Sequence, residues 1–285
     1  MQFLGRIIRK TCEGYEYESD EKHVKILLEE WDMENCKPLT SPGAAIEKPN
    51  EIERGEQEKE LDKREATVYR RAAARLNYMS LDRADLSYAS KEASRGMSRP
   101  TVGDSIRLKR ILRYLRGSPR VVNQFVWQEP QDKIIGYSDS DWAGCTKTRK
   151  SSSGGCMLMG RHLLAHWSST QTVIALSSAE AELNAIVKMF SETIGLRNTL
   201  KDMGRVMTIV IYTDSSASNG MVHRVGCGKV KHLETRQLWI QEYVNNKAVG
   251  VMKIPRAENV SDALTHHWSA VDGSRHFEKI GIIWK

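Results

Sequence analysis

Apolar and polar positions in the second half of the chain follow the pattern of strands and helices in alternation. Three segments from Lys133 onward, KIIGYSD, SGGCMLMG and LLAHWSS, are rich in strand formers and separated by turn residues, which predicts an antiparallel meander. A long helix at about 178–203 follows, then the strand TIVIYT, helices at about 216–223 and 234–246, the strand VGVMKIP and a short helix beginning near Val260. This order indicates a mixed sheet covered by helices.

The first half is patterned differently. Residues 2–17 alternate weakly and predict one or two strands, and a helix is expected at about 22–33. Three prolines and the mixed charge run GEQEKELDKRE follow, which predicts a flexible charged linker at 40–64. Helices are then expected at about 66–80, 83–97 and 101–115, so a small helical region precedes the sheet.

The composition narrows the class of protein. With 285 residues and 40% apolar residues, the chain is long enough for one large domain or two ordinary ones. It has neither a run of about 20 apolar residues nor an apolar signal region, so we expect no membrane association and a cytoplasmic or nuclear location. Five scattered cysteines without a CxxC pair argue against a disulfide framework and against structural zinc.

The positive charge is concentrated in one segment. The net charge is +7, yet residues 66–130 alone carry thirteen Lys and Arg against five Asp and Glu. In the helix at 101–115, Lys109, Arg113 and Arg116 lie beside an apolar stripe. They are candidates for contact with nucleic-acid phosphates, and the alternative is an ordinary solvated helix face.

Four acidic motifs stand where strands or helices begin or end. They are YSDSDWAG around Asp139, SSAEAEL around Glu182, IYTDSSAS around Asp214 and ENVSDALT around Asp262. Four carboxylates gathered in one place would raise one another's pKa, so a fold that collects them must bind cations. The pattern therefore points to a metal-dependent nuclease.

Each of these acids also has a structural interpretation. Asp139 could form a turn, Asp214 could cap a helix, and Asp262 could interact with a helix dipole. Helical periodicity does not decide between Glu180 and Glu182, since they flank the apolar stripe on opposite sides. Asp141 is expected to be structural.

In order, context and spacing, the four motifs resemble the ribonuclease H domain of copia-type LTR retrotransposon polyproteins. The segments YSDSDWAG, TRKSSSGG, HWSSTQTVIALSSAEAEL, IYTDSSAS, KHLETRQLWIQE and PRAENVSDALT match that family's successive signatures. Upstream, FLGRIIRK, NCKPLTSP, YRRAAARLNYMSLDRADLSYA and LKRILRYLRGSP are similar to the segment after the polymerase palm. The resemblance thus covers nearly the whole chain.

The resemblance implies a domain organisation and a fold. Residues 1–39 would be a remnant of the reverse transcriptase palm and thumb, 65–130 a basic thumb and connection region, and 131–285 a ribonuclease H-like domain. That domain would contain a five-stranded mixed sheet flanked by helices, with Asp139 and Asp214 on adjacent parallel strands. No Tyr-x-Asp-Asp motif occurs, so we expect the chain to begin after the polymerase site and not to synthesise DNA.

The resemblance also implies a chemistry. It makes Asp139, Glu182, Asp214 and Asp262 both the catalytic residues and the metal ligands, the A-E-L triplet selecting Glu182. Two Mg²⁺ ions about 3.5 to 4 Å apart are expected, with Mn²⁺ as a substitute. The expected partners are an RNA/DNA hybrid, cut in its RNA strand, and the upstream reverse transcriptase segment. Arg149 is a further candidate substrate contact.

Two departures from the family pattern leave alternatives open. The loop PRAENVS lacks the histidine that bacterial ribonucleases H carry before their last acidic helix, and His266 and His267 replace the family's usual lysine and proline. A catalytically inactive or domesticated fragment that only binds nucleic acid is the main alternative. A transposase or integrase core on a related fold fits the motifs less well.

Overall fold

The computed structural model of the chain describes residues 1–44, 51–228 and 235–285, which form two compact units. The first unit comprises Met1–Phe125, His267–Glu278 and Ile282–Lys285, and the second comprises Val126–His266 and Lys279–Gly281. The sequence predicts boundaries near 40, 65 and 131. In the structure, residues 1–39, the later helices and the last residues of the chain belong to the first unit.

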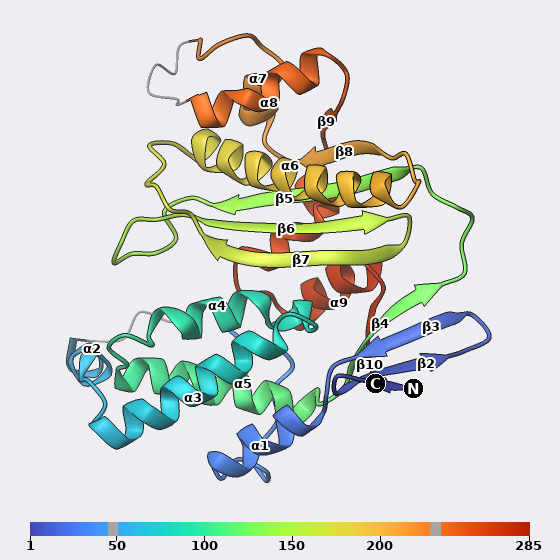
Figure 1. Cartoon of the computed structure of the whole chain (residues 1–285). Helices are drawn as coiled ribbons and strands as arrows, with labels where there is room; N and C mark the ends of the chain where they lie inside the picture. The colour runs from blue at the N-terminus through green and yellow to red at the C-terminus, as the bar shows by residue number, and fades with distance from the viewer. Residues whose placement is uncertain (45–50, 229–234) are drawn as a thin grey trace. The chain divides into compact units, whose positions relative to one another are not determined.

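The second unit is built on a mixed sheet (Figure 1). Strands β5 (Lys133–Asp141), β6 (Ser152–Met159) and β7 (His162–Thr170) form the predicted antiparallel meander. Strand β8 (Thr208–Thr213) pairs in parallel with β5, and β9 (Gly250–Lys253) pairs in parallel with β8. The strand order β7-β6-β5-β8-β9 confirms the expected ribonuclease H-like class of a five-stranded mixed sheet with helices.

Helix α6 (Ser178–Asp202) packs against β5, β6 and β8 (Figure 1). Ser177 begins the helix because its side chain accepts a hydrogen bond from the Glu180 backbone N–H. Helices α7 (Ser216–Val222) and α8 (Thr235–Asn245) pack against each other and against α6. The expected loop VGCGKVKH and the start of the KHLETRQLWIQE motif fall partly on residues 229–234, outside the described residues.

Glycines allow elements to approach both faces of this sheet closely. A Cβ on Gly136 or Gly155 would lie within 3 Å of Met189 on α6. A Cβ on Gly154 would instead lie 2.7 Å from the Thr265 side chain and 3.0 Å from the Ser261 carbonyl oxygen. Since successive strand residues face opposite sides, α6 covers one face and the segment around Ser261–Thr265 covers the other.

The segment at the second face is shorter than the helix expected from the sequence. It consists of two 3₁₀ turns, η2 (Arg256–Glu258) and η3 (Val260–Leu264), and η3 packs against β5 and β6. Asn259 joins the two turns: its side-chain amide donates to the Ser138 carbonyl at 3.0 Å, and its side-chain oxygen accepts from Ser261. These bonds attach the turns directly to β5.

The first unit has a sheet of its own, with the order β1-β2-β3-β4-β10. Its strands are β1 (Gln2–Phe3), β2 (Arg6–Lys10), β3 (Gly14–Glu18), β4 (Val121–Val126) and β10 (Ile282–Trp284). The sequence predicts only one or two strands at 2–17 and neither β4 nor β10. Strand β10 has only three residues, and its partner β4 lies far away in the sequence, so no local pattern predicts this pair.

The helices of the first unit are α1 (Lys22–Glu30), α2 (Glu51–Glu58), α3 (Lys63–Met79), α4 (Ser87–Arg95), α5 (Val102–Gly117) and α9 (Ala270–Lys279), with a 3₁₀ turn η1 (Ala84–Leu86) before α4. Asp62 and Thr101 begin α3 and α5 with capping boxes. Helix α2 lies within the expected flexible linker, because a mixed charge run also suits an exposed helix.

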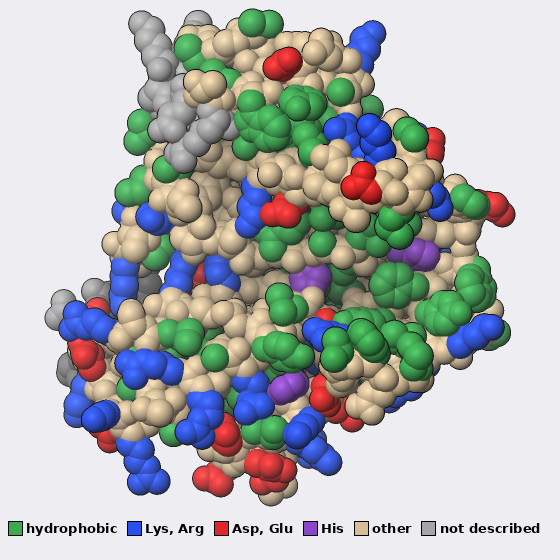
Figure 2. Space-filling view, in the orientation of Figure 1, with side chains coloured by type: hydrophobic (Ala, Val, Ile, Leu, Met, Phe, Trp, Pro, Cys, Tyr) green, Lys and Arg blue, Asp and Glu red, His purple; other side chains and the backbone are tan. Residues whose placement is uncertain are grey.

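Basic and acidic side chains alternate on the surface of the first unit. Figure 2 shows Lys and Arg side chains along its helical part, with Asp and Glu side chains between them. Inside the unit, Arg83 and Asp85 form a fully buried ion pair with an N–O distance of 2.7 Å, and the Tyr114 hydroxyl donates to the same carboxylate at 2.7 Å. Part of the basic character read from 66–130 is therefore neutralised within the fold.

Candidate metal and nuclease site

Four elements bring acidic side chains together beyond the carboxyl ends of the central strands of the second unit. Asp139 lies near the end of β5, and Asp214 follows β8 directly, on the neighbouring parallel strand. Glu182 lies in the second turn of α6, and Asp262 lies on η3. The expectation that Asp139 and Asp214 end adjacent parallel strands therefore agrees with the observed sheet.

Three of the four carboxylates converge. One side-chain oxygen from each of Asp139, Glu182 and Asp214 lies within 4.8 Å of the other two. Asp262 is outside this group but close enough to raise the pKa of Asp139 and Asp214 by its charge. The sequence treats the four acids as equivalent, whereas the structure distinguishes a cluster of three from a neighbour.

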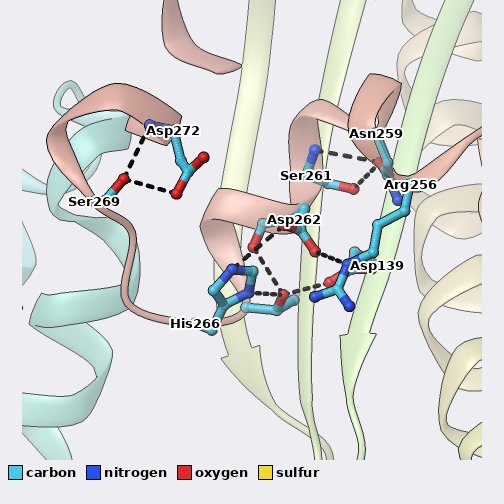
Figure 3. A network of polar contacts seen from close by, with 9 residues as sticks. Asp139, Arg256, Asn259, Ser261, Asp262, His266, Ser269 and Asp272 are labelled. Carbon is cyan, nitrogen blue, oxygen red and sulfur yellow. Dashed lines mark hydrogen bonds and ion pairs between the residues drawn. The ribbon is translucent and has the colours of Figure 1, made fainter. Parts of the chain in front are cut away.

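Asp262 has partners of its own (Figure 3). One of its oxygens accepts from Arg256 Nε at 3.1 Å, and the other lies 3.3 Å from His266 Nε2. The Arg256 side chain is 73% exposed, so it reaches Asp262 from the solvent side. Arg256 and His266 thus contact one oxygen each of the Asp262 carboxylate.

Burial makes the cluster costly to charge. Asp139 and Glu182 are only 6% and 9% exposed. Burial, together with the Asp214 and Asp262 charges, raises the pKa of Asp139 to about 7, although the Thr265 hydroxyl opposes the rise. Burial and the charges of Asp139 and Asp214 raise the pKa of Glu182 to about 9. Burial also raises the pKa of Asp214.

The donor atoms of the cluster determine whether a divalent cation can bind there. The Glu182 Oε2 atom is buried and has no hydrogen-bond partner. A buried oxygen without a partner, beside two further carboxylate oxygens, is destabilising unless a cation binds there. The donors are all oxygens, the atoms that Mg²⁺ and Mn²⁺ prefer. The cluster therefore fits such an ion.

Thr265 supports the cluster, and sequence reasoning did not single it out. It is 1% exposed, and its hydroxyl donates a hydrogen bond to Asp139 Oδ2 and lies 3.0 Å from the Asp262 carbonyl oxygen. Thr265 thus links the η3 turn to the β5 carboxylate. Its place in the D-A-L-T motif was the available signal, but nothing in the sequence connects it to Asp139.

Geometry distinguishes Glu182 from Glu180. The Glu180 carboxylate accepts a hydrogen bond from the Leu176 backbone N–H at 2.8 Å, at the start of α6. Glu182 instead joins Asp139 and Asp214. Asp141 folds back toward Gly144, where a Cβ would lie 1.6 Å from one of its oxygens. Of Glu180, Glu182 and Asp141, only Glu182 belongs to the cluster.

The basic candidates have varied surroundings. On α5, Arg113 Nε donates to the Lys37 carbonyl at 2.8 Å, and Arg116 Nε donates to the Glu34 carbonyl. These two side chains thus attach residues 34–37 to the helix, a role that their spacing on the helix face did not indicate. Lys109 lines a cavity of the first unit. Arg149 lies in the turn between β5 and β6.

Comparison with known proteins agrees with the motifs. No protein-family model matches the chain. It is 32% identical over 272 residues, 93% of its length, to the retrovirus-related Pol polyprotein from transposon TNT 1-94 of Nicotiana tabacum. It is 29% identical over 99% of its length to the corresponding polyprotein from transposon RE2 of Arabidopsis thaliana. The matches cover 20% and 19% of those polyproteins.

Among solved structures, the chain is similar to LC11 ribonuclease H1, isolated from compost. The match covers 47% of this chain and 93% of that one, with 20% identity and a TM-score of 0.38. The strand order and the acidic cluster define the second unit as a ribonuclease H-like domain. The chain is a relative of the Pol polyproteins of copia-type retrotransposons and spans about a fifth of their length.

Within the described ranges, the helices lack the length and apolar composition that crossing a bilayer requires.

Proposed function

We propose that the chain is the ribonuclease H part of a retrotransposon reverse transcriptase polyprotein and cuts the RNA strand of RNA/DNA hybrids. The observation that carries this proposal is the approach of Asp139, Glu182 and Asp214 oxygens to within 4.8 Å of one another. Two buried carboxylates and a half-buried one at that separation, with one buried oxygen unpartnered, are poorly stable without cations.

In this proposal, Asp139, Glu182, Asp214 and the neighbouring Asp262 would hold two divalent ions. Two bound Mg²⁺ ions, or Mn²⁺ in their place, would supply Lewis-acid activation of a water and stabilisation of the leaving oxygen. The chain's own residues position the ligands. Thr265 orients the Asp139 carboxylate, and Arg256 and His266 orient Asp262.

Specificity for a hybrid rests on backbone recognition in this proposal. A 2′-hydroxyl distinguishes RNA from DNA at the cut strand, and contacts to phosphates and sugars would make cleavage indifferent to base sequence. The upstream reverse transcriptase segment is the expected partner, and the first unit would correspond to its thumb and connection regions. The cytoplasm or the nucleus is the proposed location.

The test is a cleavage assay on the purified full chain. A labelled RNA/DNA hybrid is incubated with and without Mg²⁺, and duplex DNA and duplex RNA are run in parallel. We expect cleavage of RNA in the hybrid alone, lost with Asp214→Asn and retained with Asp202→Asn, whose side chain is exposed at the end of α6. Binding of the hybrid without cleavage would favour the inactive fragment, and nicking of duplex DNA would favour the transposase alternative.

A further inference from the structure

An exposed tryptophan follows the strand that carries Asp139. Trp142 comes directly after β5 and is 48% exposed. Its indole N–H donates a hydrogen bond to the Ala175 carbonyl oxygen at 3.0 Å, and Ala175 itself is buried. Ala175 lies just before α6, which carries Glu182. Trp142 therefore ties the segment after one carboxylate to the segment before another, while much of its ring system remains in solvent.

Two aliphatic side chains on the same segment are exposed as well. Ile174 is 52% exposed and Leu176 is 66% exposed, on either side of the buried Ala175. Apolar side chains gathered at a surface commonly mark a binding site. Anchoring by the indole N–H orders Trp142 without burying it, as expected of a side chain held ready for a ligand.

The turn that follows Trp142 is ordered and basic. In the segment CTKTRK, the Cys145 N–H donates to the Lys150 carbonyl at 3.3 Å, and the Arg149 N–H donates to the Cys145 carbonyl at 2.7 Å. Arg149 has a φ of 56°, an uncommon conformation for a residue other than glycine. Lys147 and Arg149 are exposed, and no residue in the described part of the chain forms an ion pair with either.

We propose that Trp142 and the 145–150 turn form a contact surface for the sugar–phosphate backbone of a nucleic acid entering the carboxylate cluster. Arg149 contacts phosphates, and the Trp142 ring packs against a sugar or an unstacked base. This inference rests on the proposed nuclease function and names a substrate contact of the same site. A cationic turn beside an exposed aromatic side chain is complementary to a nucleic-acid strand in both charge and apolar surface.

The position of the surface favours the substrate over another partner. Trp142 lies three residues beyond Asp139, so their Cα atoms are at most about 11 Å apart and a molecule that covers Trp142 lies near the cluster. A protein bound there would obstruct the substrate, whereas the substrate itself must pass. The hydrogen bond to Ala175 then fixes Trp142 in a position to bind the substrate beside the cluster.

Binding can be measured on the full chain with Asp214→Asn as background, so that the hybrid is not cut. We expect Trp142→Ala to weaken binding of a labelled RNA/DNA hybrid about tenfold and Trp142→Phe to retain most of the affinity. Arg149→Gln should lower the slope of log Kd against log salt concentration by about one, the effect of one lost phosphate contact. Each variant is first checked for unchanged circular dichroism.

Matched controls lie elsewhere in the second unit. Trp127, 59% exposed, precedes β5, and Arg161 lies in the β6–β7 turn, at the opposite end of β6 from the 145–150 turn. Trp127→Ala and Arg161→Gln should leave both affinity and salt slope unchanged. An unchanged affinity in Trp142→Ala, or an unchanged slope in Arg149→Gln, would overturn the proposal. So would a change in oligomeric state without a change in affinity for the hybrid.

Failure of this inference is distinct from failure of the nuclease proposal. If the unsubstituted chain cleaves the hybrid and Trp142→Ala has the same KM, the surface is refuted and the ribonuclease stands. If the chain binds the hybrid through Trp142 and Arg149 but does not cleave it, the surface stands and the ribonuclease is refuted.

Discussion

Replacing Glu182 by glutamine should stabilise the fold while it abolishes cleavage. The carboxyl is 9% exposed, and burial with the neighbouring Asp139 and Asp214 charges raises its pKa from 4.5 to about 9. The folded protein therefore holds a proton at pH 7 that the unfolded chain releases. Taking up that proton costs about 1.4 kcal/mol per pH unit above 4.5, or about 3 kcal/mol at pH 7. Glutamine has a similar shape and avoids this cost.

The direction in which the free energy of unfolding changes with pH follows from proton linkage. The folded state binds more protons than the unfolded state between pH 4.5 and about pH 9, so the free energy of unfolding falls as pH rises through that window. Asp139, with its pKa raised to about 7, adds to the fall over the lower part of the window. Glu182→Gln should flatten this dependence, and the stabilisation it produces should vanish toward pH 4.5.

The assay is chemical denaturation in EDTA from about pH 5 to pH 8, followed by circular dichroism. Glu192→Gln, an exposed position on the same helix, is the matched control and should change stability by less than about 0.5 kcal/mol. Added Mg²⁺ should stabilise the unsubstituted chain more than the Glu182→Gln variant. Superimposable pH profiles for the two chains would refute the assignment of Glu182 to a strained acidic cluster.

Other substitutions test the supports of the site and of each unit. Thr265→Val removes the hydroxyl that lowers the pKa of Asp139, so the acid limb of the rate profile should move to higher pH, and Thr265→Ser should restore it. Gly154→Ala places a Cβ 2.7 Å from Thr265 and should cost about 1–3 kcal/mol of stability in a denaturant titration, whereas Gly195→Ala, with open space around it, should stabilise α6 by about 0.5–1 kcal/mol. Asp85→Asn leaves the buried Arg83 charge unpaired and should cost about 3–5 kcal/mol, measured as a lower denaturant midpoint.

Much of the second unit could be predicted because its signals are local. The strands at 133–141 and 208–213 end near Asp139 and Asp214. Because the two strands are parallel, both acids lie at the same edge of the sheet. Periodicity could not show that Glu182, and not Glu180, joins the cluster. The difference depends on which of the two carboxylates accepts the hydrogen bond from the Leu176 N–H. That contact is local, but it depends on the backbone conformation of the segment before α6, which periodicity does not give.

Other features depend on partners far away in sequence. The 3₁₀ geometry of 260–264 follows from its attachment to β5 by Asn259 and its approach to Gly154. Helix α2 was missed because its charged residues suit a linker and an exposed helix equally. The sequence predicts phosphate contacts for Arg113 and Arg116, but it does not predict their hydrogen bonds to backbone carbonyls more than seventy residues away.

The return of the chain to its first unit bears on how the protein can be synthesised. Strand β4 gains its outer neighbour only when Ile282–Trp284 has left the ribosome, whereas the last strand of the second unit, β9, precedes that segment in the chain. For the roughly 10 to 30 s in which the intervening residues are translated, one side of β4 has unsatisfied backbone hydrogen-bonding groups, the kind of edge at which nascent chains aggregate. The sheet of the second unit can thus be complete before the sheet of the first, although most of its sequence follows that of the first unit.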